Sequence, residues 1–266
     1  MAFATDLVRV SDPSCESTLA CAKPASQDGM VERLCSPWAA SVDGISGGGW
    51  IAGRVPSGSM ELDHVLIAVA DLRAAAAAFE SLYGLTSVEG GRHVGWGTAN
   101  RIVPLGDAYL ELIAVVDWDE AAGSAFGQWV ASGQAGQPFG WAVRTDELDE
   151  VVQRLDLNVR PGSRPTADGG VLRWRIAGIE QAASEPFLPF FIEWAPGGLF
   201  PGWTAVHHKA GAAEITQLIV SGDPDRLSVW LGTLPLAIVV SAGSPQITQV
   251  IITTAAGPLV LGANQG

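Results

Sequence analysis

The sequence has few positive charges, and this shortage excludes two classes of partner. Its 15 lysine and arginine residues face 28 aspartate and glutamate residues, which gives a formal net charge of −13. A surface that binds nucleic acid or an anionic membrane needs a basic patch. We therefore expect neither a nucleic-acid partner nor a membrane partner.

Long apolar runs and paired cysteines are also lacking. Apolar residues make up 48% of the 266 residues, enough for a sizeable core, but no run reaches the about 18 residues that span a membrane. The cysteines, Cys15, Cys21 and Cys35, lack C-x-x-C spacing, and their odd number argues against a disulfide framework. No charged start followed by an apolar stretch indicates a secretory signal, so we expect a cytoplasmic protein.

Residues 1–59 differ from the rest of the chain. They are rich in Ser, Gly, Pro and Ala and show no clear periodicity. We expect a poorly structured N-terminal extension. A regulatory or lid segment that carries Trp38 and Trp50 is the alternative.

From residue 62 onward, one order of elements occurs three times. Residues 62–69 resemble a strand, Asp71 offers an N-cap for a helix over 72–83, and Gly84 ends it. Strands are expected at 85–89, 100–105 and 109–116, and a looser stretch, 117–138, connects to the second copy. The second copy is expected to contain a strand at 139–145, a helix at 147–155, and strands at 157–160, 171–177 and 187–195. The third is expected to contain a strand from 214, a helix at 223–232, and strands at 236–240, 247–253 and 257–261. Because repeats define architecture, we predict an α+β fold of repeated βαβββ units.

Isolated ionisable residues stand out in three of these apolar strands. His64 lies in Leu-Asp-His-Val-Leu-Ile-Ala-Val, Glu111 in Tyr-Leu-Glu-Leu-Ile, and Glu193 in Phe-Phe-Ile-Glu-Trp. A buried charge without a partner costs several kcal/mol, so each side chain needs one. Strand alternation places Glu111 on the face of Tyr109, and Glu193 on the face of Phe191.

A repeated βαβββ unit with these motifs resembles the vicinal oxygen chelate superfamily, in particular its glyoxalase-like branch. The resemblance implies a cup-shaped, curled mixed sheet with helices on its outer side. It also implies that residues 60–200 form a glyoxalase-like domain of two units and that 212–266 form a degenerate third unit. The third copy could pair with its counterpart in another subunit, so a homodimer stays open.

The same resemblance implies a divalent metal at the floor of the cup. The family's ligand positions fall on His64, Glu111, Gly140 and Glu193. Gly140 has no side chain to offer, which leaves His64, Glu111 and Glu193 as expected metal ligands and catalytic residues. One histidine and two carboxylates suit Mn, Fe, Zn, Ni or Co. The alternative is a metal-free cup whose histidine and carboxylates are satisfied by backbone carbonyls and arginines.

Substrate-binding residues are expected around the cup. The Gly-rich segment 90–100 presents Arg92, His93, Trp96 and Asn100, although a tight turn explains it equally well, and Trp141 is a further candidate. The predicted function is binding of a small oxygenated organic molecule by a lyase-, isomerase- or dioxygenase-type enzyme. The alternative is a non-catalytic protein that sequesters a drug or metabolite.

Overall fold

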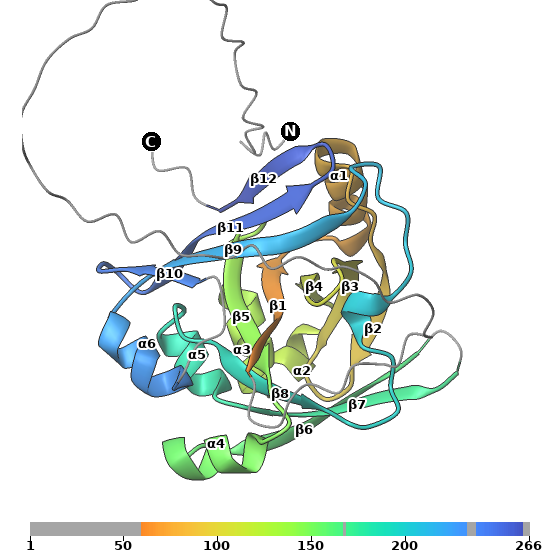
Figure 1. Cartoon of the computed structure of the whole chain (residues 1–266). Helices are drawn as coiled ribbons and strands as arrows, with labels where there is room; N and C mark the ends of the chain where they lie inside the picture. Colours follow the sequence, from red (N-terminus) through yellow and green to blue (C-terminus); the bar gives the residue numbers. More distant parts are fainter. Residues whose placement is uncertain (1–59, 167–168, 233–237, 263–266) are drawn as a thin grey trace, which may run out of the picture. The chain divides into compact units, whose positions relative to one another are not determined.

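Eight strands form a sheet that curls until its two edge strands approach each other (Figure 1). The computed structural model describes residues 60–166, 169–232 and 238–262, so the predicted extension over 1–59 lies outside the described residues. The strand order is β2-β3-β4-β1-β5-β8-β7-β6. This confirms the predicted α+β fold with a curled mixed sheet.

Each half of this sheet comes from one copy of the predicted unit. The first half contains β1 (Glu61–Ala68), α1 (Leu72–Tyr83), β2 (Val88–His93), β3 (Thr98–Pro104) and β4 (Tyr109–Val115). The second contains β5 (Pro138–Arg144), α4 (Leu148–Leu155), β6 (Val159–Pro165), β7 (Val171–Ala177), α5 (Ile179–Ser184) and β8 (Phe190–Trp194). The first strands, β1 and β5, pair antiparallel at the centre, and each pairs in parallel with the last strand of its own unit.

Helix α1 shows how local sequence sets the ends of an element. The Asp71 side chain accepts a hydrogen bond from the Ala74 backbone N–H at 2.7 Å, which satisfies one donor of the first turn. Gly84 ends the helix in the left-handed conformation, with φ of 67°. Between these caps, Phe79 and Tyr83 turn toward the core.

The connection between the two units is helical, contrary to the looser stretch expected at 117–138. It forms α2 (Trp118–Ala122), capped by Asp117, and α3 (Ala125–Ser132), capped by Ser124. Phe126 and Trp129 of α3 pack against residues on the inner face of the curled sheet, such as Leu66. The apolar side of this short helix therefore fills part of the cup.

The third copy repeats the order of elements but not the pairing of strands. A 3-10 turn (Pro201–Trp203) is followed by β9 (Ala213–Ser221), α6 (Pro224–Leu231), β10 (Ile238–Ser241), β11 (Gln246–Thr254) and β12 (Gly257–Leu261). Here β9 pairs in parallel with β10 and antiparallel with β11, in a separate four-stranded sheet. In the first unit, by contrast, β1 pairs in parallel with β4.

The outer face of the curled sheet is covered by the largest apolar cluster. Val65, Trp141 and Phe191 from this sheet join Leu218 and Val250 from the four-stranded sheet in it. Side chains from α1, α4 and α6 belong to the same cluster. Burial of this shared surface stabilises the four-stranded sheet against the curled one.

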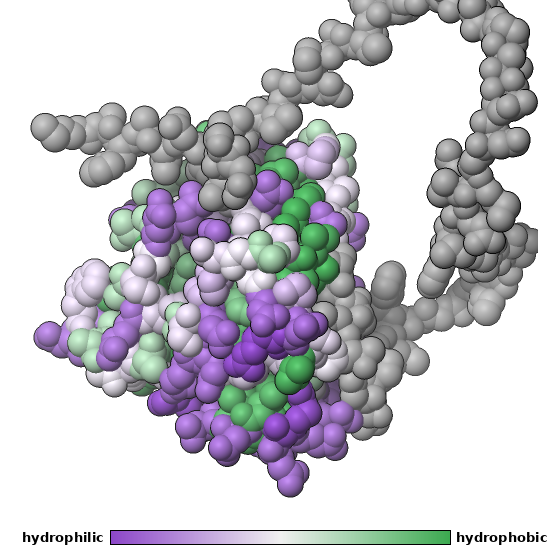
Figure 2. All heavy atoms as spheres, turned by 90° about the vertical axis from the view of Figure 1, so that its left-hand side faces the viewer, coloured by the Kyte–Doolittle hydropathy of each residue, from purple (hydrophilic) through white to green (hydrophobic). Residues whose placement is uncertain are grey.

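One face of the molecule shows how apolar and hydrophilic residues are distributed. On the face drawn in Figure 2, apolar areas are broken up by hydrophilic residues. Among the described helices, none combines the length and the apolar character that crossing a bilayer requires.

Candidate functional site

A pocket lies on the inner face of the curled sheet. It contains about 400 Å³ of space not filled by atoms, part of it open to solvent. Its lining combines a small polar group with a larger aromatic and aliphatic wall. The lining residues are His64, His93, Trp96, Asn100, Ile102, Tyr109, Glu111, Phe126, Arg164, Trp174, Ile176, Phe190, Ile192, Trp194 and Pro201.

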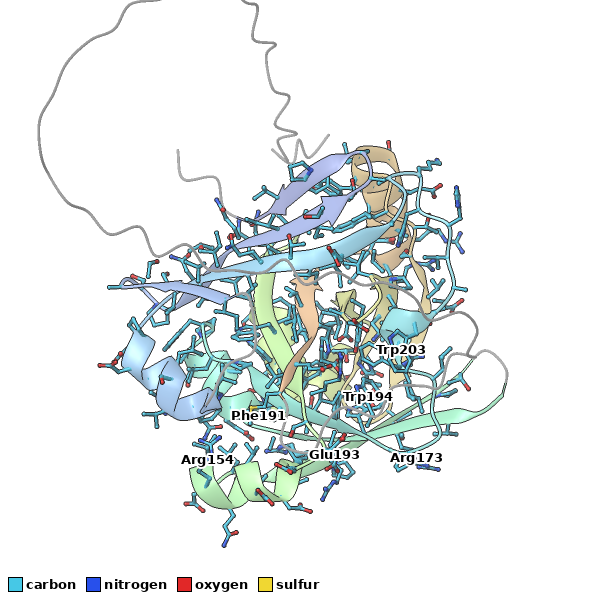
Figure 3. The ribbon with its side chains drawn as sticks, viewed as in Figure 1. Arg154, Arg173, Phe191, Glu193, Trp194 and Trp203 are labelled. Atoms are coloured by element: carbon cyan, nitrogen blue, oxygen red, sulfur yellow. The ribbon has the colours of Figure 1, made fainter. Side chains whose placement is uncertain are left out.

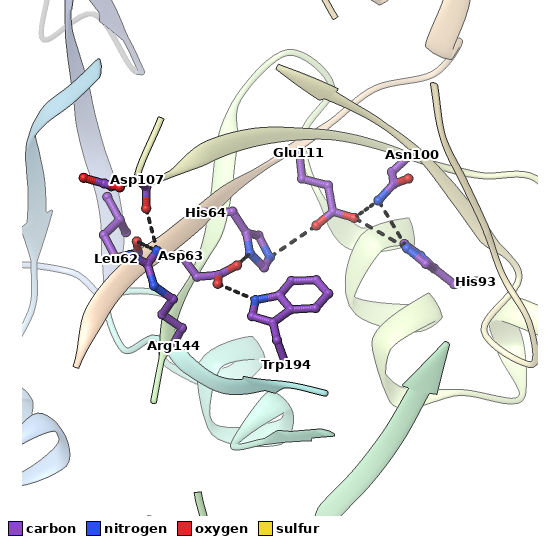
Figure 4. Close-up of polar contacts among 9 residues, drawn as sticks. All are labelled: Leu62, Asp63, His64, His93, Asn100, Asp107, Glu111, Arg144 and Trp194. Carbon is purple, nitrogen blue, oxygen red and sulfur yellow. Dashed lines mark hydrogen bonds and ion pairs between the residues drawn. The ribbon is translucent and has the colours of Figure 1, made fainter. Parts of the chain in front are cut away.

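His64 lies between two carboxylates at the base of this pocket (Figure 4). Its Nδ1 is 2.5 Å from Asp63 Oδ1, and its Nε2 is 3.2 Å from Glu111 Oε2. The ring is 2% exposed and stacks on Tyr109 with a centroid separation of 4.7 Å. Both ring nitrogens of His64 therefore face carboxylate oxygens, which can accept a hydrogen bond from whichever nitrogen carries a hydrogen.

Asp63 reaches the pocket side because β1 carries a bulge. The pairing of β1 with β5 shifts register between Leu62 and His64, which leaves Asp63 as the extra residue. Its Oδ2 accepts a hydrogen bond from Trp194 Nε1 at 2.7 Å, and its side chain is fully buried. Strand alternation alone would have sent Asp63 to the opposite face from His64.

Glu111 is held from its other side by an asparagine and a histidine. Asn100 Nδ2 donates to Glu111 Oε1 at 2.6 Å, and the same amide nitrogen lies 3.2 Å from His93 Nε2. His93 Nδ1 lies 2.9 Å from Thr98 Oγ1. Burial lowers the pKa of His93 and so favours its neutral form. In the neutral tautomer whose Nε2 accepts from Asn100, the ring hydrogen is on Nδ1 and points to Thr98.

Together these contacts form one buried polar chain across the pocket base. It runs from Trp194 in β8 through Asp63, His64, Glu111, Asn100 and His93 to Thr98 in β3. Such a network is stable only when its members are paired, because the low local dielectric makes an unpaired polar group costly. The chain fixes His64 and Glu111 in one arrangement.

The structure brings five of the predicted site residues to this pocket. They are His64, Glu111, His93, Trp96 and Asn100. The Gly-rich segment around them is needed for close packing, since a Cβ at Gly90 would lie 1.9 Å from Asn100 Oδ1.

Glu193 is not part of the cluster, so the expectation that it shares a site with His64 and Glu111 is corrected. In β8 the side chains that line the pocket belong to Phe190, Ile192 and Trp194, and alternation sends Glu193 to the opposite face (Figure 3). There its carboxylate pairs with Arg175, which also binds Asp149 of α4.

Arg92 and Trp141 are also placed away from the pocket. Arg92 is exposed and pairs with Asp117 and Glu120. Trp141 is opposite Val65 in the β1–β5 pairing, so it faces the outer apolar cluster, where its Nε1 donates to the Phe187 carbonyl. Both corrections have one cause: the sequence shows which residues alternate, but not which face curls inward.

The metal site expected from the family does not fit the residues present. Over the described ranges, no group of three or more His, Cys, Asp and Glu side chains is arranged to hold a metal ion. His64 and Glu111 contact each other, His93 Nε2 is occupied by Asn100, and Gly140 packs against Trp129. The predicted set of His64, Glu111 and Glu193 is therefore not assembled.

Comparison with known proteins decides the family. The glyoxalase-like domain family matches residues 62–234, which is more than half of the chain. The chain belongs to the glyoxalase-like domain family. It is thus a glyoxalase-like protein of the vicinal oxygen chelate superfamily, which confirms the resemblance seen in its sequence.

Solved structures similar to this chain include one that shares its fold and two with lower TM-scores. A hypothetical protein from Staphylococcus aureus is 15% identical, with a TM-score of 0.57 over 76% of this chain and 98% of that one. Methylmalonyl-CoA epimerase from Mycobacterium tuberculosis is 20% identical, with a TM-score of 0.37 over 52% of this chain and 88% of that one. The Streptomyces coelicolor epimerase, in complex with 2-nitronate-propionyl-CoA, is 19% identical, with a TM-score of 0.38 over 52% and 97%. Among curated proteins, none matches this glyoxalase-like sequence.

Several pocket residues of this glyoxalase-like protein escaped sequence reasoning. Asp63 beside the pocket is the most informative case. Its place next to His64 can be read from the sequence, but the β-bulge that brings the two side chains together cannot. Arg164 was missed because the strand expected at 157–160 extends to Pro165. The second unit's wall, Trp174, Ile176, Phe190, Ile192 and Trp194, offered no polar signal.

Proposed function

We propose that this glyoxalase-like protein is an enzyme that transfers a proton between carbon and oxygen in a small oxygenated organic molecule. The observation that carries the proposal is the buried His64–Glu111 pair at the pocket base. Each member is also anchored by a second polar group, Asp63 or Asn100. Pairs of positioned acids and bases in a water-poor pocket are suited to proton transfer.

The contacts give each residue a separate role. Asn100 binds Glu111 Oε1, so Oε2 is the oxygen available to accept a proton from the substrate carbon. His64 Nε2–H is the donor nearest to that oxygen and would protonate the neighbouring substrate oxygen. The C–H proton moves to Glu111, the oxygen receives a proton from His64, and an enol results. Glu111 then returns its proton to carbon, and the enol oxygen returns its proton to His64, which regenerates both groups. Return to the same carbon, after Glu111 has exchanged its proton with solvent, labels the substrate, and protonation at the other carbon of an enediol gives the isomerised product.

Asp63 and the aromatic wall support this step. Asp63 accepts from His64 Nδ1–H and thereby fixes which nitrogen faces the substrate. Phe190 lies edge-on to the His64 ring at 5.4 Å, and Trp174 and Trp194 continue the apolar wall. This wall excludes water, which strengthens electrostatic interactions at the pair. None of these steps uses a metal, and we expect the activity to survive dialysis against EDTA.

Hydrogen exchange at carbon tests the proposal directly. The protein is incubated in D₂O with hydroxyacetone, 2-oxobutanoate or 2-oxo-4-phenylbutanoate, and loss of the C–H signals is followed by NMR. We expect exchange above the protein-free rate for at least one compound, and a loss of about 10²-fold or more in His64→Gln. His207→Gln is the matched control, because that histidine is exposed and its side chain is remote from the pocket.

The alternative is a non-catalytic binding protein, which the large aromatic wall favours. Pocket tryptophans report binding by fluorescence, independently of any reaction. Binding of these compounds with exchange at the protein-free rate for all three would overturn the proposed enzyme and support the binding protein. Exchange that persists in His64→Gln would overturn the role given to His64.

A further inference from the structure

Arg164 is the one lysine or arginine among the residues that line the pocket. It extends from β6, at the edge of the curled sheet, and donates a hydrogen bond to the Gly90 carbonyl of β2. The guanidinium has five N–H donors, so this one contact leaves most of its hydrogen-bonding capacity unused.

Two arginines of the same hairpin pair with carboxylates, whereas Arg164 has no such pair among the residues that the structure describes. Arg160 pairs with Glu180, and Arg175 pairs with Asp149 and Glu193. Within the described ranges, Arg164 has no carboxylate within ion-pair distance, although it is partly buried. Burial lowers its pKa, which shows that the charged form is poorly solvated there. A partly desolvated cation gains most from an anionic partner.

The charge of Arg164 acts on the chemical centre of the pocket. Burial raises the pKa of Tyr109, and the positive charge of Arg164 opposes part of that rise. The same charge also contributes to the lowered pKa of His93. Because Arg164, His64 and Glu111 line the same pocket, one ligand can contact the guanidinium at one end and His64 and Glu111 at the other.

We propose that Arg164 makes the pocket selective for substrates that carry one carboxylate. This inference rests on the proposed function, and it names the substrate class of the same site. A guanidinium binds a carboxylate through two parallel hydrogen bonds. A dianionic phosphate or phosphonate is disfavoured, because the carboxylates of Glu111 in the pocket lining and of Asp63, buried beside His64, would repel the additional charge.

Binding of matched probes tests this selectivity. Phenylacetate, phenylacetamide and benzylphosphonate share the aromatic group and differ in charge, and quenching of Trp96, Trp174 and Trp194 reports binding. We expect phenylacetate to bind at least tenfold more tightly than either other probe. Arg164→Gln should remove this preference and leave phenylacetamide binding unchanged, and Arg164→Lys should restore part of it. Arg173→Gln, on the exposed side of the paired strand β7, should bind all three probes as the unaltered protein does.

The outcomes separate this inference from the proposed function. Equal affinity for phenylacetate and phenylacetamide, tighter binding of benzylphosphonate, or no binding of phenylacetate overturns the role of Arg164. If Arg164→Gln fails to fold, the relative affinities of the unaltered protein for the three probes still decide whether the pocket prefers a carboxylate. If hydroxyacetone then still exchanges its C–H hydrogens in a way that depends on His64, the proposed proton transfer is retained, with a neutral substrate. Arg164-dependent phenylacetate binding without any exchange would leave the selectivity standing in a binding protein.

Discussion

The two units of the curled sheet contribute different halves of the same pocket. The first unit supplies the polar groups His64, His93, Asn100 and Glu111, whereas the second supplies Trp174, Ile176, Phe190, Ile192 and Trp194, with Arg164 at its edge. Related units can therefore share a fold while one supplies most of the polar side chains of a pocket and the other supplies much of its apolar wall. The difference also explains why a symmetric metal site is not assembled.

Replacing a carboxylate in each unit should give the largest contrast. Glu111→Gln keeps the shape but removes the proposed base, so we expect carbon–deuterium exchange to fall by about 10²- to 10⁴-fold. Glu193→Gln alters the corresponding strand of the second unit on the face away from the pocket. Its exchange rate should be unchanged, and NMR in D₂O measures both. A comparable loss in Glu193→Gln would contradict the division between the two units.

Gly140 tests why the second unit lacks the family's ligand at this position. A Cβ there would lie 2.5 Å from ring atoms of Trp129, so Gly140→Ala should lower the free energy of unfolding by about 1–3 kcal/mol. Gly123→Ala is the control, because its closest contact would be 3.4 Å. Urea denaturation measures both variants. Equal stability would show that Trp129 moves freely and that packing does not restrict this site.

Trp194, in the apolar wall from the second unit, donates a hydrogen bond to Asp63 of the first unit. Trp194→Phe keeps an aromatic ring but removes the N–H that binds Asp63 Oδ2, leaving a buried carboxylate oxygen with one partner fewer. We expect a loss of about 1–3 kcal/mol of unfolding free energy. Trp203→Phe, at a side chain 47% exposed, should change the stability little. Equal free energies of unfolding for the two variants, measured by urea denaturation, would show that the Trp194–Asp63 hydrogen bond does not stabilise the fold.

His93 should produce the smallest effect, visible in the pH dependence of stability. The pKa of His93 in the folded protein lies below its ordinary value. Its contribution to the free energy of unfolding is therefore complete above about pH 6.5, and it is lost as the pH falls through that value toward the folded pKa. The unfolded chain binds the proton more readily in this range. His93→Gln should flatten the slope of unfolding free energy against pH below 6.5. An unchanged slope would show that His93 is not the titrating group.

Sequence reasoning predicted the architecture and the proximity of His64 and Glu111, and it failed where geometry depends on the curvature of the sheet. His64 and Glu111 were recognisable because a lone ionisable residue in an apolar strand needs a partner. Glu193 met the same criterion, but the inward face of β8 is the one that carries Phe190 and Trp194. Asp63 was missed because a single inserted residue in β1 reverses the expected alternation. The four-stranded sheet shows the same limit, since element order predicted its strands but not their pairing.

The buried polar chain has a consequence for how this protein tolerates change. Because it begins on β8 and ends on β3, it is a tether between the two halves as well as the setting of the proposed reaction. A substitution within this polar chain should therefore weaken the contact between the two units and should also slow the proposed proton transfer. Substitutions should be tolerated best at positions outside this polar chain, such as Trp203. Substitutions at Arg164 and in the aromatic wall should change which ligands bind while leaving the polar chain intact.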